Sequence, residues 1–274
     1  MAERPSRIRL LGDQVVYQTR VFWRTPIAAV FTVVFPLMLL LLFNALFAGE
    51  TFQIAGRPPL EVAQFYAPSL AVFAAASATY TNLTINTAIA RDEGILKRFL
   101  GTPLPPGIHL GGRVGSAVGV AAVAVVLMLG VGALLYGVEI RVELLPAAAL
   151  TFVVGVAAFA ALGLAMAGIA GSSDAAQALA NFTILPLAFV SDVFVAIADP
   201  PAWLETIGDL FPLKHFVRAF QDAFSPFTTD AGFRWVHLGV IALWGVLGAV
   251  AALRSFGWQP RAPRGRRARR PSAV

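Results

Sequence analysis

The chain has 274 residues, of which 58% are apolar and 13% charged, and it carries a formal net charge of +6. Soluble domains average about 45–50% apolar and about 25% charged residues, so this composition excludes an ordinary water-soluble enzyme. The sequence contains no cysteine, which excludes disulfides, thiolate nucleophiles and cysteine-based metal sites.

Six long stretches with almost no charge predict six transmembrane helices. A helix needs about 20 mostly apolar residues to cross the hydrocarbon core, and each stretch has roughly that length or more. The stretches cover residues 25–49, 62–90, 114–138, 144–173, 175–198 and 235–253, the fifth with one charge at Asp192. We therefore predict an all-α polytopic membrane protein. It has an amphipathic amino-terminal segment (1–26), a six-helix transmembrane domain (27–254) and a basic tail (255–274).

The positions of the basic residues predict the orientation in the membrane. Of the 21 Lys and Arg residues, 16 lie in the amino-terminal segment, the loop after the second stretch or the carboxy-terminal tail. Cytoplasmic loops carry the excess of Lys and Arg, so both termini are expected in the cytoplasm. The predominance of arginine over lysine and the abundant alanine are typical of a high-GC bacterium, so a bacterial inner or plasma membrane is expected. A cleaved signal peptide is disfavoured because Leu46 and Phe47 occupy positions where cleavage requires small residues.

The amino-terminal segment has the spacing of an amphipathic helix. Its apolar residues Ile8, Leu11, Val15 and Phe22 recur at helical intervals. A basic helix of this kind can lie in the plane of the lipid headgroups. The alternative is a flexible amino terminus. In the first span that follows, Pro36 removes one backbone hydrogen bond, which predicts a kink.

The second half of the second span is polar. Hydroxyl and amide side chains cover most of its circumference, so this half is expected to face other helices or a wet cavity. Thr79, Asn82 and Asn86 are candidates for lining a substrate pathway, together with Asn181 of the fifth span. The alternative is that these side chains only form hydrogen bonds within and between helices.

The loop after the second span has the charge order of a short helix. Acidic residues come early and basic residues late, and a glycine and a proline then stop the helix. Leu96, Phe99 and Leu100 form an apolar edge that suits a groove of another protein. The alternative is a solvated connector. The candidate docking residues are Arg91, Asp92, Glu93, Gly94, Leu96, Lys97, Arg98 and Phe99.

Small residues at four-residue spacing predict close helix packing in two spans. The third span carries Gly111, Gly115 and Gly119, and the fourth carries a similar ridge that begins at Gly163. The partner helix belongs either to the same subunit or to a second copy. These glycines do not indicate nucleotide binding.

The segment before the last span is expected on the outer side. Its apolar residues form a stripe over Leu213–Phe224, which is too short to span the membrane but long enough for an interfacial or re-entrant helix.

No pattern of a catalytic or metal site is present in the sequence. His109, His215 and His237 lack the spacing of a zinc motif, and there is no phosphate-binding loop. The longest segment outside the spans is also too short for an ATPase domain, so nucleotide-driven work requires a separate chain. The arginine-rich tail is expected to contact anionic lipid and not nucleic acid.

The loop after the second span resembles the cytoplasmic loop of type 2 ABC exporter permeases. The similar stretch runs from Glu93 through Gly-Ile-Leu-Lys-Arg-Phe-Leu-Gly-Thr-Pro-Leu to Pro105. Further similar patterns are the basic amphipathic amino terminus, residues 181–187 of the fifth span and residues 201–213 before the last span. Members of the family often have Ser-Gly near the end of the fifth span, where this chain has Ser191 and Asp192.

This resemblance implies a half-transporter. Two permease copies, expected to form a homodimer, would pair with separate ABC ATPase subunits that bind ATP and Mg, and this chain would need no cofactor. The helix 91–100 would transmit nucleotide-driven closure, and the amino-terminal helix would be the second contact. The apolar spans favour export of a hydrophobic or amphipathic small molecule, such as a drug, antibiotic or lipid. The alternatives are an ABC permease for a glycan and an ion-coupled secondary transporter.

Overall fold

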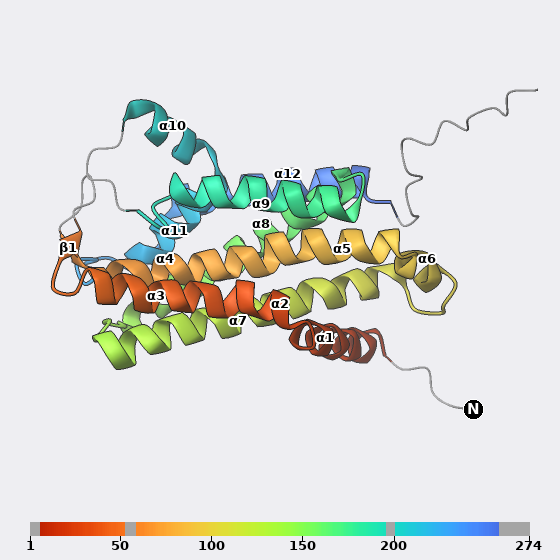
Figure 1. The fold of residues 1–274 in the computed structure, drawn as a ribbon, viewed down its shortest axis with the longest axis horizontal. Helices are drawn as coiled ribbons and strands as arrows, with labels where there is room; N and C mark the ends of the chain where they lie inside the picture. Colours follow the sequence, from red (N-terminus) through yellow and green to blue (C-terminus); the bar gives the residue numbers. More distant parts are fainter. Residues whose placement is uncertain (1–5, 53–58, 196–200, 258–274) are drawn as a thin grey trace, which may run out of the picture.

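A computed structural model describes residues 6–52, 59–195 and 201–257 of the chain. The helices form an elongated bundle, with a two-residue strand pair at one end and the short helix α6 at the other (Figure 1). The strands β1 (Thr51–Phe52) and β2 (Leu60–Glu61) are antiparallel. This arrangement confirms the all-α polytopic architecture. Most of the tail, from Trp258 onward, lies outside the described residues.

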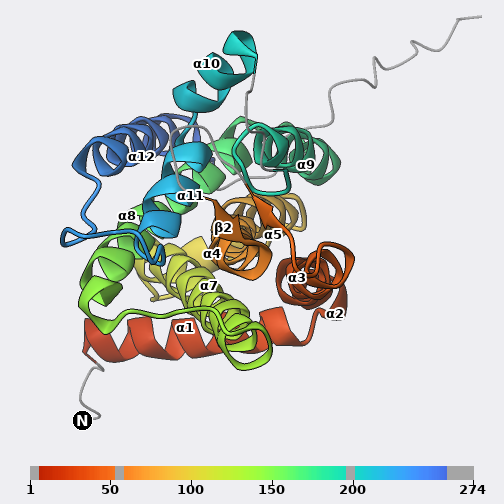
Figure 2. The same cartoon turned by 90° about the vertical axis from the view of Figure 1, so that its left-hand side faces the viewer.

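Helix α1 (Arg7–Trp23) confirms the predicted amino-terminal helix. Ser6 caps its first turn, because the Ser6 hydroxyl accepts a hydrogen bond from the Arg9 amide. The helix runs along one side of the bundle, at a steep angle to the spans (Figure 2). It packs on α7 (Pro106–Tyr136) at the predicted glycine ridge. A Cβ on Gly115 would lie 2.7 Å from Val15 Cγ2, so this crossing requires glycine.

The first span is broken close to Pro36. It consists of α2 (Pro26–Ala29), a π-turn (Val30–Val34) and α3 (Phe35–Leu46). In the π-turn the amide of Phe35 donates to the carbonyl of Val30, five residues back. A proline one residue later cannot donate a hydrogen bond, so the irregular turn adjoins the position where the sequence predicts a kink.

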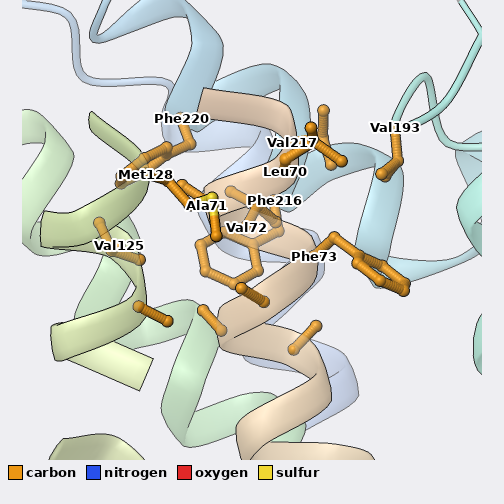
Figure 3. Close-up of a cluster of buried hydrophobic side chains, with 14 of the residues drawn as sticks. Leu70, Ala71, Val72, Phe73, Val125, Met128, Val193, Phe216, Val217 and Phe220 are labelled. Atoms are coloured by element: carbon orange, nitrogen blue, oxygen red, sulfur yellow. The ribbon is translucent and has the colours of Figure 1, made fainter. Parts of the chain in front are cut away.

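The second span forms the centre of the bundle. It consists of α4 (Val62–Ala76), a second π-turn (Ser77–Thr81) and α5 (Asn82–Asp92). Its most apolar window is entirely buried within the single subunit. Figure 3 shows side chains of α4 packed between Met128 of α7 and Phe216 of α11 (Pro212–Asp222). The polar second half, in α5, packs on α8 and α9, as the sequence predicts for that half.

The predicted helix 91–100 is interrupted at Gly94. Gly94 has a left-handed conformation with φ of 71°, which a glycine adopts without strain. Asp92 therefore ends α5, and the separate helix α6 spans only Ile95–Leu100. The sequence predicts Asp92 and Glu93 in the first turn of the loop helix, but both residues lie before the start of α6.

The remaining helices form the other side of the bundle. They are α8 (Leu145–Ile169, after a 3-10 turn at Val142–Leu144), α9 (Ser173–Phe189), α10 (Ala202–Leu210) and α12 (Trp235–Ser255). Helix α11 packs on α4, α8 and α12 and buries the predicted apolar stripe.

Five of the described spans are long and apolar enough to cross a membrane. The expected fifth span, α9, has 17 residues, or about 25 Å of helix. Six spans therefore remain a prediction.

Candidate functional site

The end of α5 is fixed to the turn between α8 and α9. The guanidinium of Arg91 donates to the carbonyl oxygens of Ala167 at 2.6 Å and Ala170 at 3.0 Å. Asp92 contacts Arg91 at 3.2 Å and accepts a hydrogen bond from the Ser173 amide at 2.6 Å. Arg91 is buried, and its donors satisfy carbonyls at the end of α8. These two candidate docking residues thus join three helices of the same chain.

The other end of the loop is joined to α7. Phe99 of α6 stacks on His109 of α7, with ring centroids 4.0 Å apart and an angle of 27° between the planes. His109 Nε2 accepts a hydrogen bond from Arg113 Nε at 3.2 Å. Its Nδ1 therefore carries the proton of the neutral ring and donates to Gln14 Oε1 of α1 at 3.3 Å. Because Arg113 also donates to the Asn86 carbonyl at 3.0 Å, α6 connects to α1, α5 and α7.

Three charged side chains of the loop are exposed. Glu93, Lys97 and Arg98 are exposed, whereas Leu96 is fully buried and anchors α6. The predicted docking residues therefore divide into two groups. Arg91, Leu96 and Phe99 hold the loop in place, and the exposed charges are available to a partner.

Two of the predicted pathway residues line one polar pocket. Asn82 and Asn86 face a cavity of about 220 Å³ between α1, α2, α5 and α7. Asn82 Nδ2 donates to the Thr32 hydroxyl in the first π-turn at 3.2 Å, and Asn86 Nδ2 donates to Asn82 Oδ1 at 2.7 Å. The polar residues therefore link the first two spans.

The other two predicted pathway residues lie elsewhere. Thr79 is fully buried, and its hydroxyl donates to the Ala75 carbonyl of its own helix at 2.7 Å. The Thr79 and Tyr80 carbonyl oxygens lie within 3 Å of where a Cβ on Gly163 would be, so Thr79 packs against α8. Asn181 is exposed on α9 and shares neither the pocket nor a hydrogen bond with the other three among the described residues.

Two apolar cavities lie farther from α6. The first has a volume of about 430 Å³ and lies between α3 and α9. The second has a volume of about 510 Å³ and lies between α8, α9 and α12. The first is rich in aromatic side chains. These are Phe35, Phe43, Phe47, Phe52, Tyr66, Phe189 and Phe194.

An ion-pair network joins the outer elements. Asp192 has φ of 56°, in the region that favours glycine, and its carboxylate accepts a hydrogen bond from Arg218 Nε at 3.3 Å. Lys214 contacts Asp209 at 2.8 Å. Burial raises the pKa of Asp209, but the hydrogen bond and charge of Lys214 and the charge of Arg218 outweigh it, so this pKa lies below its ordinary value. The positive φ at position 192 is easier for glycine than for aspartate, which explains why family members often have Ser-Gly where this chain has Ser191 and Asp192.

Comparison with known proteins identifies the family. The family model of the ABC-2 type transporter matches residues 15–225, which is most of the chain. The chain belongs to the ABC-2 type transporter family. A curated relative of this permease is the daunorubicin resistance ABC transporter permease protein DrrB1 of Streptomyces coeruleorubidus, which is 28% identical over 232 residues. The match covers 80% of this permease and 77% of that protein.

Family membership confirms the resemblance to ABC exporter permeases. This permease is the membrane subunit of an ABC exporter in the bacterial plasma membrane.

Sequence reasoning misses three residues of the site. The sequence shows only that His109 lacks the spacing of a zinc motif, and it indicates no role for Arg113 or Thr32. Their partners are distant in sequence, and no local spacing identifies them.

Proposed function

We propose that two copies of this permease form an exporter with a separate ABC ATPase chain and move a hydrophobic or amphipathic small molecule out of the cell. The observation that carries this proposal is the attachment of the loop at both ends. Arg91 and Asp92 fix the end of α5, just before α6, to α8 and α9, and Phe99 of α6 contacts His109 of α7, which is bonded to α1. A displacement of α6 therefore acts on several spans together.

The exposed side of the loop is the proposed docking surface for the ATPase. Lys97 and Arg98 offer exposed positive charges there. The proposed second contact is α1, whose Arg9, Asp13 and Arg20 are exposed. Binding of ATP and Mg is assigned to the partner chain. With both termini in the cytoplasm, as the positive charges predict, α6 lies on the side of the ATP supply.

The aromatic cavity between α3 and α9 supports an apolar substrate. Its volume of about 430 Å³ falls within the range of about 300–1,000 Å³ for sites that hold drug-sized ligands. Aromatic rings bind such molecules through large apolar contacts. Phe182 and Leu185 on the exposed side of α9 extend this apolar surface, and we assign a second permease copy to that face.

Daunorubicin is the first probe to test, because the curated relative is named as a daunorubicin resistance permease. Inside-out vesicles that contain this permease and the ATPase encoded beside it should accumulate daunorubicin only when ATP is added. Vesicles with the permease alone should not. Uptake by the permease alone, driven by a proton gradient and indifferent to ATP, would support the ion-coupled alternative and contradict the proposal.

The distribution of charge favours the ATP-driven mechanism. Ion-coupled carriers place ionisable residues near the middle of the membrane. In the described spans, the charged residues lie near the helix ends, as Arg91, Arg113 and Arg254 do.

A further inference from the structure

The polar pocket beside α1 contains two opposite charges that do not contact each other. Glu93 and Arg113 both line it, and so do the polar residues Gln18, Asn82, Asn86 and Ser116. Within the described residues, neither charged group has an oppositely charged partner within 4 Å. A ligand with an anionic and a cationic group therefore finds a partner for each.

Arg113 has donors to spare. Its Nε binds His109 and its Nη1 binds the Asn86 carbonyl, and both acceptors are uncharged. The Nη2 group donates to no described residue, although the side chain is largely enclosed. A partly buried guanidinium with free N–H groups suits a phosphate oxygen, because charge-assisted hydrogen bonds to phosphate are strong.

The two charges lie at different depths. Asn86, the residue that Arg113 contacts, is seven residues or two helical turns from Glu93 along α5. Glu93 is at the end of the helix, beside α6, and is exposed. In the predicted orientation the site for an anion is therefore deeper than the site for a cation. In a phospholipid of the inner leaflet, the phosphate likewise lies deeper than the amine.

The size and surroundings of the pocket suit a headgroup. Its volume of about 220 Å³ is below the range of about 300–1,000 Å³ for drug-sized ligands, so it accommodates a compact polar group. Val21 of α1 and Ile89 of α5 line it and are exposed. This apolar surface lies where the acyl chains of a bound lipid would run. Helix α1 lies beside α7, toward the end of the bundle that carries α6 (Figure 1).

We propose that this pocket binds the headgroup of an aminophospholipid, with its phosphate on Arg113 and its ammonium on Glu93. Gln18 and Asn86 supply further hydrogen-bonding groups. Each such lipid binds one permease copy, and the site is distinct from the aromatic cavity between α3 and α9. The inference concerns lipid binding and stands whether or not the exported molecule is hydrophobic.

Native mass spectrometry of the purified full chain tests this proposal directly. The chain is mixed with equal amounts of phosphatidylethanolamine and phosphatidylglycerol of distinguishable mass, and the retained lipids are counted. We expect phosphatidylethanolamine to be retained at least about tenfold better, since Glu93 selects the ammonium. Free phosphoethanolamine at the same concentration should not displace it, because the acyl chains contribute to binding.

Two variants and a control separate binding from folding. Glu93→Gln, a change on an exposed side chain, should abolish the preference between the two lipids. Arg113→Gln should reduce retention of both. Arg24→Gln removes an exposed charge outside the pocket and should match the unmodified chain. Equal retention of the two lipids by the unmodified chain, or an undiminished preference in Glu93→Gln, would overturn the proposal.

Discussion

The ring of Phe99 lies against the imidazole of His109, with the centroids 4.0 Å apart. This contact joins the loop helix α6 to α7, and the hydrogen bond between His109 and Gln14 extends the connection to α1. Phe99 itself is half-buried, between the exposed charges of α6 and the buried imidazole. It is therefore the residue through which we propose that the ATPase acts on the spans.

Arg91 is expected to stabilise the fold rather than to contact the ATPase. Arg91→Met removes two charge-assisted hydrogen bonds and leaves the carbonyls of Ala167 and Ala170 without them. We expect a loss of roughly 2–4 kcal/mol in the free energy of unfolding. The exposed Arg98→Met is the matched control and should unfold like the unmodified chain. Thermal unfolding in detergent measures both, and equal stability of the two variants would contradict this role.

The crossing of α1 over α7 should not tolerate a side chain at Gly112. A Cβ there would lie 2.5 Å from Gln14 Cβ and 3.1 Å from the Gln14 carbonyl carbon. We expect Gly112→Ala to lower stability by about 1–3 kcal/mol, as overpacking does. It should also speed tryptic cleavage at Arg20.

Gly119→Ala is the control for this crossing. Gly119 lies on the same helix, and a Cβ there meets nothing within 4 Å. Alanine favours a helix over glycine, so this variant should be neutral or up to about 1 kcal/mol more stable. If Gly112→Ala is as stable as Gly119→Ala, the result would contradict the close contact between α1 and α7.

The ion pair of Asp209 and Lys214 predicts a stability loss in acid. The pKa of Asp209 is below its ordinary value of 3.8, so its stabilising effect is complete above that value and is lost as the pH falls through the lower, folded-state pKa. Because Asp209 is 47% exposed, we expect about 1 kcal/mol or less. The melting temperatures of the unmodified chain and of Asp209→Asn should differ near neutral pH, and this difference should vanish once the pH falls below the lowered pKa of Asp209.

Asp13→Asn is the control for that measurement, since Asp13 is exposed and has no ion pair among the described residues. It should leave the melting temperature unchanged at both pH values. A difference between the unmodified chain and Asp209→Asn that persists in strong acid would contradict the ion-pair assignment.

The sequence predicts most elements of this fold but few of its contacts. Apolar length and helical spacing identify the spans, α1 and the buried stripe of α11, because those signals are local. The break at Gly94 was missed, since the charge order of 91–100 fits one continuous helix. The burial of Arg91 was missed because its partners are backbone carbonyls about eighty residues away, which leave no mark in the sequence.

The sequence gathers the candidate docking residues in one loop but does not reveal their contacts. Lys97 and Arg98 are exposed, and their contact with an ATPase stays a prediction. The polar half of the second span indicated a wet or packed environment, but nothing local distinguishes Asn82, which reaches a pocket, from Thr79, which bonds within its helix. Three-dimensional contacts alone separate these alternatives.

The coupling role of Phe99 is tested most directly by ATP-driven export. Inside-out vesicles with the ATPase and either the unmodified permease, Phe99→Ala or Phe227→Ala are compared for ATP-dependent daunorubicin uptake at equal permease content. Phe227 is half-exposed at the opposite end of the molecule and serves as the control. We predict that Phe99→Ala inserts normally but loses at least about 90% of the uptake, since it loses the contact with His109, and that Phe227→Ala retains it. Undiminished uptake with Phe99→Ala would contradict the account.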